Sequence, residues 1–223
     1  QDLSENSNVS GEQNDSNDVE VDADWLNLFE RYAEDASSER MQNLWGRILA
    51  GEIRRPGRFS LRTLRYISEI SQKEANLFAK YSRFFVERFA PKSLIVSPDK
   101  KDISDLLLLE ENGLIQGASG PGLSITRTVP PHGFIIFVDK NTAIGLKAEP
   151  GQELRFDVVI LTDLGLQLLD LITDRDEVGC LTQIASGFRS ENTTAAYIFP
   201  RQGDNVNLTP LQVLWLTDAE EPG

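Results

Sequence analysis

Residues 37–89 constrain the fold more than any other segment, because they carry three consecutive helical patterns separated by turn and capping residues. Ser37 or Ser38 is expected to cap the first helix, and Gly51 to supply the left-handed residue that ends it. Short connections between amphipathic helices favour mutual packing, so the segment predicts a small helical core. The first pattern places these apolar side chains on one stripe: Met41, Leu44, Trp45, Ile48 and Leu49.

The breaks between the three patterns fall at residues with strong turn and cap preferences. The Pro-Gly dipeptide at residues 56–57 forces a turn, since proline lacks the amide hydrogen that a helix needs. Ser60 is placed to open the second helix. Ser71 opens the third, where Glu74 completes a capping box, and the expected apolar face of this helix extends as far as Phe89.

Part of this segment resembles an uncharacterised bacterial family of unknown function and, more distantly, the abortive-infection alpha proteins of phage defence. The similarity lies in LWGRILAGEIRRPGRFSLRTL, at residues 44–64, and in SQKEANLF, at residues 71–78. The order of elements matches to about residue 172. Since that family has no established active site, the resemblance implies no catalytic residue. The distant likeness implies a role in phage defence or in the control of mobile elements.

Two further segments precede the helical core. Residues 1–21 are rich in Ser, Asn, Asp and Glu and nearly devoid of large apolar side chains. Such a segment buries too little surface to offset its ordering entropy, so we expect a disordered acidic tail. Asp22 or Asp24 then caps a helix that ends near Asp35. The apolar face of this helix is expected to hold Trp25, Leu28, Phe29 and Tyr32.

The chain beyond the helical core mixes strand and helix patterns. Residues 93–97, SLIVS, predict a short strand from their β-branched content. A helix follows over residues 103–112, capped by Asp102 and stopped by Gly113. Four apolar or alternating runs then predict a hairpin or small antiparallel sheet: residues 123–129, 133–139, 142–148 and 154–161.

This order of elements resembles the winged-helix pattern, in which a helix ends at a Gly-Leu-Ile turn, a hairpin forms the wing, and the returning strand feeds a Thr-capped helix. Gly113 and Thr162 occupy the corresponding positions. Farther on, residues 195–199 predict a strand and residues 211–216 form another apolar run. One more amphipathic helix is expected around Val178, Leu181, Ile184 and Phe188.

We therefore predict an α+β fold, with a helical N-terminal half and a winged-helix-like C-terminal half that contains a small antiparallel sheet. The expected divisions are an acidic tail at 1–21, a helical domain at 22–95, a winged-helix-like region at 96–173 and an extension at 174–223. The chain has no apolar run of about eighteen residues, so no transmembrane helix is predicted. One cysteine excludes an internal disulfide and suits a cytoplasmic location.

The net charge of -13 conceals a segregation of charge along the chain. Residues 1–36 carry eleven acids and one base, and residues 37–95 carry twelve bases and five acids. The remainder carries nineteen acids and nine bases. A basic region therefore lies between two acidic flanks, and the acidic tail could shield it within the chain.

The residues that usually perform catalysis are scarce. The one histidine, His132, lies in a proline-rich turn, where we expect a solvated or hydrogen-bonded side chain rather than a general base. Cys180 lies among apolar residues and is expected to be a small buried side chain. Carboxylates cluster near Asp102 and Asp174, where helix capping is the simpler explanation. The sequence predicts no catalytic residue, no metal site and no cofactor.

Six arginines around the Pro-Gly turn form the most distinctive polar feature: Arg47, Arg54, Arg55, Arg58, Arg62 and Arg65. They would attract an anionic partner such as a nucleic acid. The alternative is internal pairing with Glu52, Glu69 and the acidic flanks. The helix over 103–112 contains no Lys or Arg, so phosphates would be repelled there rather than recognised.

These observations favour binding over catalysis. The leading hypothesis is a bacterial interaction protein that binds a protein partner or copies of itself. The second hypothesis is nucleic-acid binding through the arginines at positions 54–65. A hydrolase that uses paired carboxylates is a third and weaker alternative.

Overall fold

The computed structural model describes residues 20–96, 103–172 and 177–217, which divide into two compact units at the boundary between Phe59 and Ser60. Nearly all of the predicted acidic tail, and the predicted cap Asp102, lie outside the described residues. The expected divisions at 95/96 and 173/174 stay predictions. No helix in the described ranges combines the length and the apolar character that crossing a membrane requires.

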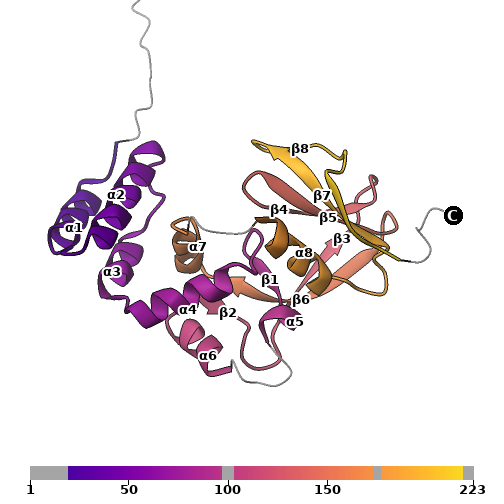
Figure 1. The fold of residues 1–223 in the computed structure, drawn as a ribbon, viewed down its shortest axis with the longest axis horizontal. Coiled ribbons are helices and arrows are strands. Elements are labelled where there is room, and N and C mark those ends of the chain that lie inside the picture. Colours follow the sequence, from indigo (N-terminus) through magenta and orange to yellow (C-terminus); the bar gives the residue numbers. More distant parts are fainter. Residues whose placement is uncertain (1–19, 97–102, 173–176, 218–223) are drawn as a thin grey trace, which may run out of the picture. The chain divides into compact units, whose positions relative to one another are not determined.

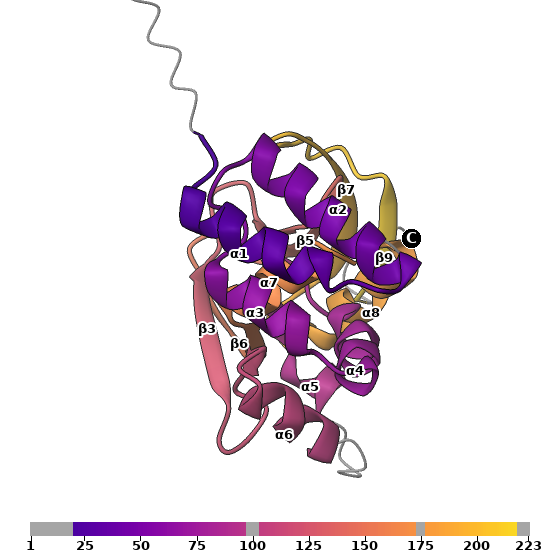
Figure 2. The ribbon, with the colours of Figure 1, turned by 90° about the vertical axis from the view of Figure 1, so that its left-hand side faces the viewer.

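The first unit is a pair of helices, α1 (Ala23–Glu34) and α2 (Glu39–Arg54), which lie side by side in Figure 2. Asp22 and Ser38 cap them, as predicted, because each side chain accepts a hydrogen bond from a backbone amide three residues on. Aromatic side chains join the pair: the Phe29 ring stacks on Trp25 and meets the Trp45 ring edge-on, with centroids 5.2 and 5.7 Å apart.

The prediction that Gly51 ends this helix was wrong, since α2 continues to Arg54. Gly51 is instead required for close packing. A Cβ atom at this position would lie 2.8 Å from Cε2 of the Phe59 side chain, which returns from the following loop. The left-handed residue of this region is Gly57, with φ of 81° in the predicted Pro-Gly turn.

The second unit begins with the two helices that the capping residues predicted, α3 (Leu61–Glu69) and α4 (Gln72–Ser82). Ser60 caps the first, and Ser71 and Glu74 form the expected capping box at the second. However, α4 does not extend to Phe89. The chain turns after Ser82, and residues Phe89–Pro91 form strand β1, because pairing with the distant strand β6 satisfies their backbone better than a longer helix would.

The predicted strand at residues 93–97 was also wrong. Residues Lys92–Ile95 form one helical turn, α5, because contacts with β6 and with α8 (Glu177–Gly187) outweigh the local preference for a strand. Helix α6 (Ile103–Glu111) then appears as expected and stops at Gly113, which has φ of 69°. The amide of Leu114 donates to the carbonyl of Leu109, which completes the predicted helix stop.

Two antiparallel sheets make up the C-terminal half (Figure 1). The first contains β1, β2 (Ile115–Gln116), β3 (Leu123–Thr128) and β6 (Glu153–Leu161), with β6 paired to the other three. The second contains β4 (Phe134–Val138), β5 (Thr142–Lys147), β7 (Ala195–Gln202), β8 (Asn205–Val206) and β9 (Gln212–Leu216). All the predicted strand runs from residue 123 onward are confirmed, but they divide between two sheets.

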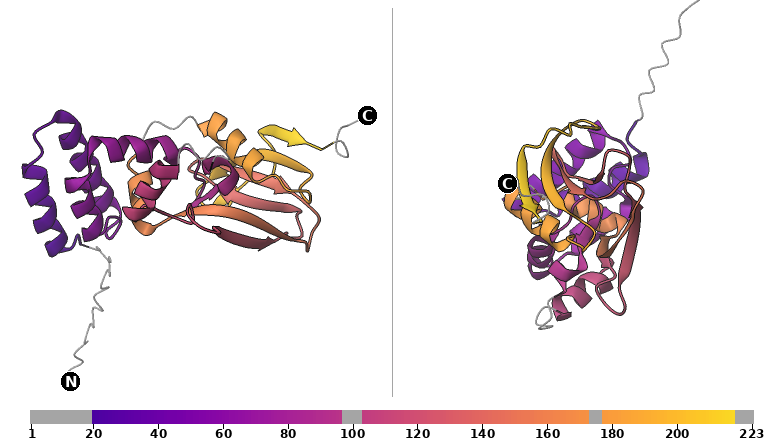
Figure 3. Two further views of the ribbon diagram at one scale, coloured as in Figure 1. Left: turned by 90° about the horizontal axis from the view of Figure 1, so that it is seen from below. Right: turned by 90° about the vertical axis from the view of Figure 1, so that its right-hand side faces the viewer.

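One hydrophobic core joins the two sheets and helix α8 (Glu177–Gly187), which lies against the sheets in Figure 3. Phe137 from the second sheet stacks on Phe188 with a centroid distance of 4.5 Å, and Phe156 from the first sheet meets the Phe188 ring edge-on at 5.3 Å. The remaining helix, α7 (Asp163–Leu169), follows β6 and is capped by Thr162, as predicted. The fold is therefore α+β, helical in its N-terminal half and built of antiparallel sheets in its C-terminal half.

Candidate functional site

A buried glutamate organises the loop that follows α2. Glu52 is 1% exposed, and its two carboxylate oxygens accept hydrogen bonds from the backbone amides of Gly57 and Phe59, at 2.5 and 2.9 Å. Hydrogen bonds to a charged acceptor are short and strong. One side chain thus holds both ends of the Gly-Arg-Phe segment that leads out of the loop.

Two further contacts hold the same loop in place. The indole Nε1 of Trp25 donates to the carbonyl oxygen of Phe59 at 2.6 Å, which ties the loop to α1. The Phe59 side chain is 1% exposed and packs against Gly51 of α2. The loop therefore has a fixed conformation with its own hydrogen bonds and its own core contact.

The arginines of this loop comprise two exposed residues and one, Arg58, whose side chain packs beside Gly51 of α2. We call residues 54–58 the arginine turn: Arg54 lies in the last turn of α2, Arg55 follows as its C-cap, and both are exposed. Arg58 is half-buried, with its guanidinium carbon 5.3 Å from the centroid of the Phe59 ring. Arg47 is exposed seven residues before Arg54, on the same face of α2.

Internal pairing with acidic side chains was the alternative prediction for these arginines, and the ion pairs in the described parts of the chain bear on it. None of those ion pairs involves Arg47, Arg54 or Arg55. Arg62 and Arg65 lie exposed on α3, in the second unit, and within the described ranges no ion pair joins Arg65 to Glu69.

Sequence reasoning missed the role of Glu52, although a signal was present. An acid near the C-terminus of a helix opposes the helix dipole, so Glu52 is poorly placed for helix stability alone. A carboxylate in that position, followed by a Pro-Gly turn, is a sign that the side chain accepts hydrogen bonds from the amides of the turn, as Glu52 does.

A second glutamate holds a glycine-rich loop in the same way. Glu110, near the end of α6, accepts hydrogen bonds from the amides of Gly117 and Ser119 at 2.7 and 3.0 Å. Partial burial raises the pKa of Glu110, but the hydrogen bonds from Ser119 and from the Gly117 and Ala118 amides outweigh that effect, so its pKa lies below the ordinary value. The glycine-rich loop is thus anchored to the helix that precedes it.

We expect Glu110→Gln to lower the free energy of unfolding at pH 7 by about 1–2 kcal/mol, because one charged acceptor is lost. A carboxylate with a lowered pKa stabilises the fold at pH values above its unfolded pKa, near 4.3, and that stability is lost as the pH falls through the folded pKa. The difference between variant and wild type should therefore shrink in urea denaturation below pH 4. Glu111→Gln, at an exposed neighbour on the same helix, is the matched control and should change stability little at either pH.

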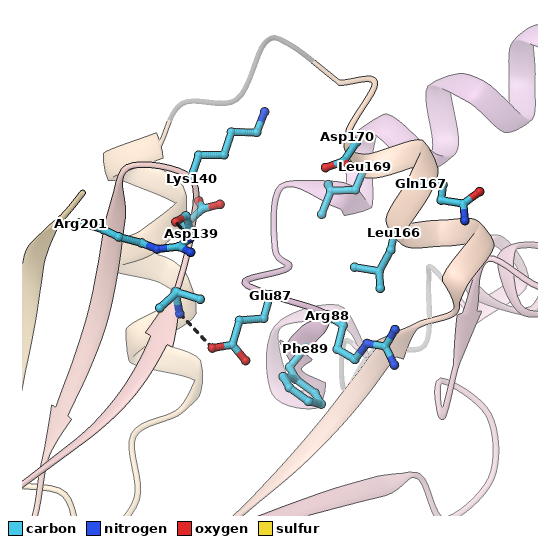
Figure 4. A pocket seen from close by; sticks show the side chains of 11 residues that line it. Glu87, Arg88, Phe89, Asp139, Lys140, Leu166, Gln167, Leu169, Asp170 and Arg201 are labelled. Atoms are coloured by element: carbon cyan, nitrogen blue, oxygen red, sulfur yellow. Dashed lines mark hydrogen bonds between the residues drawn. The ribbon is translucent and has the colours of Figure 1, made fainter. Parts of the chain in front are cut away.

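The second unit also contains an open cavity of about 600 Å³ between the β4–β5 turn and α7 (Figure 4). Charged side chains of both signs line it, and Phe89, Leu166 and Leu169 supply apolar surface. Glu87 points toward β4 in the figure and has an unusual backbone φ of 54°. The charged lining residues are Glu87, Arg88, Asp139, Lys140, Asp170 and Arg201.

Several of these charges are already bound within the protein. The two oxygens of Glu87 accept hydrogen bonds from the Val138 amide at 3.0 Å and from Nη2 of Arg127 at 2.9 Å. Arg88 forms an ion pair with Asp163 at 2.8 Å. Arg201 donates to the carbonyl oxygen of Asp139 at 2.8 Å. The charged residues of this cavity thus mainly join neighbouring strands and helices to one another. The described lining contains no Ser, Thr, Cys, His or Tyr that could act as a nucleophile.

The residues considered for catalysis occupy ordinary structural positions. His132 is exposed in its turn, where its Nδ1 accepts a hydrogen bond from the Phe134 amide at 3.3 Å, as the prediction of a hydrogen-bonded turn residue allowed. Cys180 is buried in α8, as predicted. Among the described residues, no three His, Cys, Asp or Glu side chains are grouped so that they could hold a metal ion.

The N-terminal part of the chain is similar to a known protein family. Residues 6–101 match the sequence profile of a family described as a protein of unknown function (DUF2806), a range that contains all of the arginine turn. No curated protein and no solved structure matches the chain significantly.

Proposed function

We propose that this chain, similar over residues 6–101 to a family of unknown function, acts by binding rather than by catalysis, and that its arginine turn binds the phosphate backbone of a nucleic acid. One observation carries the proposal. Glu52 holds the turn through two backbone amides, while Arg54 and Arg55 stay exposed without ion pairs to the described residues.

The physical basis is the match between arginine and phosphate. A guanidinium group presents several donors in a plane, which suits the oxygens of a phosphodiester. Each phosphate that is neutralised also releases condensed counterions from the nucleic acid, which favours binding. Because the backbone of the turn is already ordered, little backbone entropy is lost when the arginines engage a ligand, and the cost that remains is the ordering of their side chains.

The experiment is a salt titration of DNA and RNA binding by the full chain. Replacing both Arg54 and Arg55 by alanine should lower the slope of log K against log salt by about 1.8 on duplex DNA, since each phosphate contact contributes about 0.9. Fluorescence anisotropy with a labelled duplex and a labelled single-stranded RNA measures both slopes.

The control replaces Arg31 and Arg40, two other exposed arginines of the first unit, by alanine. It lowers the net charge of the chain by the same amount as the test variant. This control should keep a slope close to that of the wild type. Equal loss in both double variants would mean that net charge, not the arginine turn, governs binding. An unchanged slope in the Arg54 and Arg55 variant would reject the proposed site.

A second candidate function is binding to a protein partner or to another copy of the chain, and the edge strand β9 favours it. In the described sheet β9 pairs only with β7. Leu211, just before it, and Val213 within it are 64% and 49% exposed. Exposed apolar side chains on an unpaired edge favour strand addition. Light scattering over a concentration series tests self-association, and a strict monomer would count against pairing between copies.

We also propose that the part of the chain from α6 to α7 has a winged-helix-like arrangement. It is supported by the end of α6 at Gly113, by the antiparallel pairing of β3 with β6, and by the passage of β6 into the Thr162-capped helix α7. Helix α6 carries Asp105, Glu110 and Glu111 but no base. It is therefore better suited to packing or protein contact than to reading DNA.

The cellular context that we propose is the bacterial cytoplasm. The single cysteine, Cys180, suits a reducing compartment. A role in phage defence rests on the distant likeness to the abortive-infection alpha proteins, and nucleic-acid binding by the arginine turn would be compatible with it.

A further inference from the structure

We propose that a cavity where α5, α8 and β6 meet binds the phosphate group of a small molecule. Helix α5 contacts both β6 and α8 in the second unit (Figure 1), and the cavity has a volume of about 490 Å³, within the range of small-molecule sites. The cavity is formed by residues of the second unit, whereas the arginine turn belongs to the first, so the inference does not depend on the proposed nucleic-acid site.

Three cationic side chains from three different elements line this cavity: Lys92 of α5, Arg155 of β6, and Arg189 just after α8. Asp157 is the one acid in the described lining, and no ion pair among the described residues involves any of the three cations. The lining therefore carries an excess of positive charge, which attracts an anion with more than one negative charge.

The positions of two of the cations are restrained. The Nζ of Lys92 donates to the carbonyl oxygen of Gly120 at 3.3 Å. The guanidinium carbon of Arg189 lies 4.9 Å from the centroid of the Trp215 ring, a cation–π contact that leaves its N–H groups available at the edge of the guanidinium plane. A preorganised arrangement of this kind lowers the entropic cost of binding.

A hydroxyl group beneath the cavity surface would add a donor to these charges once its side chain changes rotamer. The Oγ of Ser190 is buried and has no hydrogen-bond partner among the described residues, although Ser190 lines the cavity. A buried hydroxyl without a partner is costly unless another group satisfies it. The neighbouring Ser93 already donates its hydroxyl hydrogen to the carbonyl of Gly187, at 3.2 Å, so its oxygen remains an acceptor rather than a second donor.

Compensation of a helix dipole is the alternative explanation for the cations. Helix α8 ends at Gly187 in the cavity lining, and its carbonyl end carries roughly half of a negative charge. One cation near that end would be enough to compensate it. Three cations, less the one acid, leave a surplus of positive charge. A phosphate group, which carries about 1.5–2 negative charges at pH 7, accounts for that surplus better than the helix end does.

Isothermal titration calorimetry of the full chain with inorganic phosphate, phenyl phosphate and acetate, at constant ionic strength in chloride, tests the assignment. Both phosphates should bind and acetate should not. Arg155→Ala and Arg189→Ala should each weaken phosphate binding by about tenfold or more, since each removes a charge-assisted hydrogen-bond donor. Arg155→Lys, which keeps the charge, should retain part of the affinity, and Ser190→Ala should weaken binding several-fold.

Two controls separate this site from others. Arg83→Ala removes an exposed arginine of the same unit that does not line the cavity, and it should leave phosphate binding unchanged. The Arg54 and Arg55 double variant should also bind phosphate normally, so failure of the nucleic-acid proposal would not affect this result. Wild-type affinity in both Arg155→Ala and Arg189→Ala, or acetate binding as tight as phosphate binding, would overturn the inference.

Discussion

Replacing Glu52 by alanine should lower the free energy of unfolding by about 3–5 kcal/mol. The side chain is buried and supplies both acceptors for the Gly57 and Phe59 amides. Its removal leaves two backbone donors without their partners and opens a space beneath the loop. Urea denaturation, followed by tryptophan fluorescence, measures the effect, because Trp25 and Trp45 are both buried in this unit.

Two comparisons separate loss of the carboxylate from general damage to the helix. Glu52→Gln keeps one carbonyl acceptor but places an NH₂ group against a backbone N–H, so we expect an intermediate loss of about 2 kcal/mol. Glu34→Gln changes an exposed glutamate near the end of α1 and should alter stability by less than about 0.5 kcal/mol. If Glu52→Ala were as stable as the Glu34 variant, the loop would not depend on this carboxylate.

Loss of this anchor should also affect binding at the arginine turn. Arg54, Arg55 and Arg58 lie in or beside the loop that Glu52 holds. A loop without its anchor samples more conformations, and ligand binding must then restore their order. A stable Glu52 variant with weaker nucleic-acid binding but an unchanged salt slope would indicate lost preorganisation rather than lost charge.

The second large effect is expected for Gly165→Ala, which should destabilise the protein by about 3 kcal/mol or more. Gly165 lies in the first turn of α7, and a Cβ atom there would be 2.2 Å from the carbonyl oxygen of Leu114 and 2.9 Å from the Leu161 side chain. The Leu114 carbonyl belongs to the backbone and accepts a hydrogen bond from the Thr162 amide at 3.0 Å. It cannot move aside without breaking that bond, so the added methyl must displace α7 itself.

Gly46→Ala is the matched control, because the same substitution on α2 meets nothing within 4 Å of the new Cβ atom. Alanine is the better helix former, so this variant should gain about 0.5–1 kcal/mol. Thermal denaturation of both variants should thus move the melting temperature in opposite directions. A stabilising effect at Gly165 would mean that α7 is not held closely against the Leu114 carbonyl.

Helix starts were the part of the fold that the sequence predicted best. Ser60, Ser71 and Thr162 each cap the helix that was expected to follow, since an N-cap depends on a side chain and an amide only three residues away. The strand runs beyond residue 123 were also identified, because alternation of apolar and polar side chains is a local property.

Helix ends and strand partners were predicted less well. Gly51 was expected to stop α2, yet it lies inside the helix, where the distant Phe59 ring occupies the space that a side chain would need. Phe89 fitted a helical spacing but pairs with Ile160 in β6. In both cases a contact made later in the chain outweighs the local preference.

In the candidate sites, too, local features were predicted from the sequence and contacts between distant residues were not. The arginines at positions 54–65 were visible as a charge cluster, but their sequence could not show whether Glu52 would bind the guanidinium groups or the backbone. The cavity lined by Lys92, Arg155 and Arg189 was not predicted at all, since these residues are separated by 63 and 34 positions in the sequence.

By itself, then, the sequence determined where most of the helices begin, which runs beyond residue 123 form strands and where positive charge is concentrated, because each of these depends on neighbours within a few residues. Only the tertiary structure decided that β4 and β5 leave the sheet of β3 and β6, that Glu52 anchors the loop amides, and that three separate cations line one cavity. These features depend on contacts between residues far apart in the chain, and the burial and hydrogen bonding that select among such contacts act only once the chain has packed.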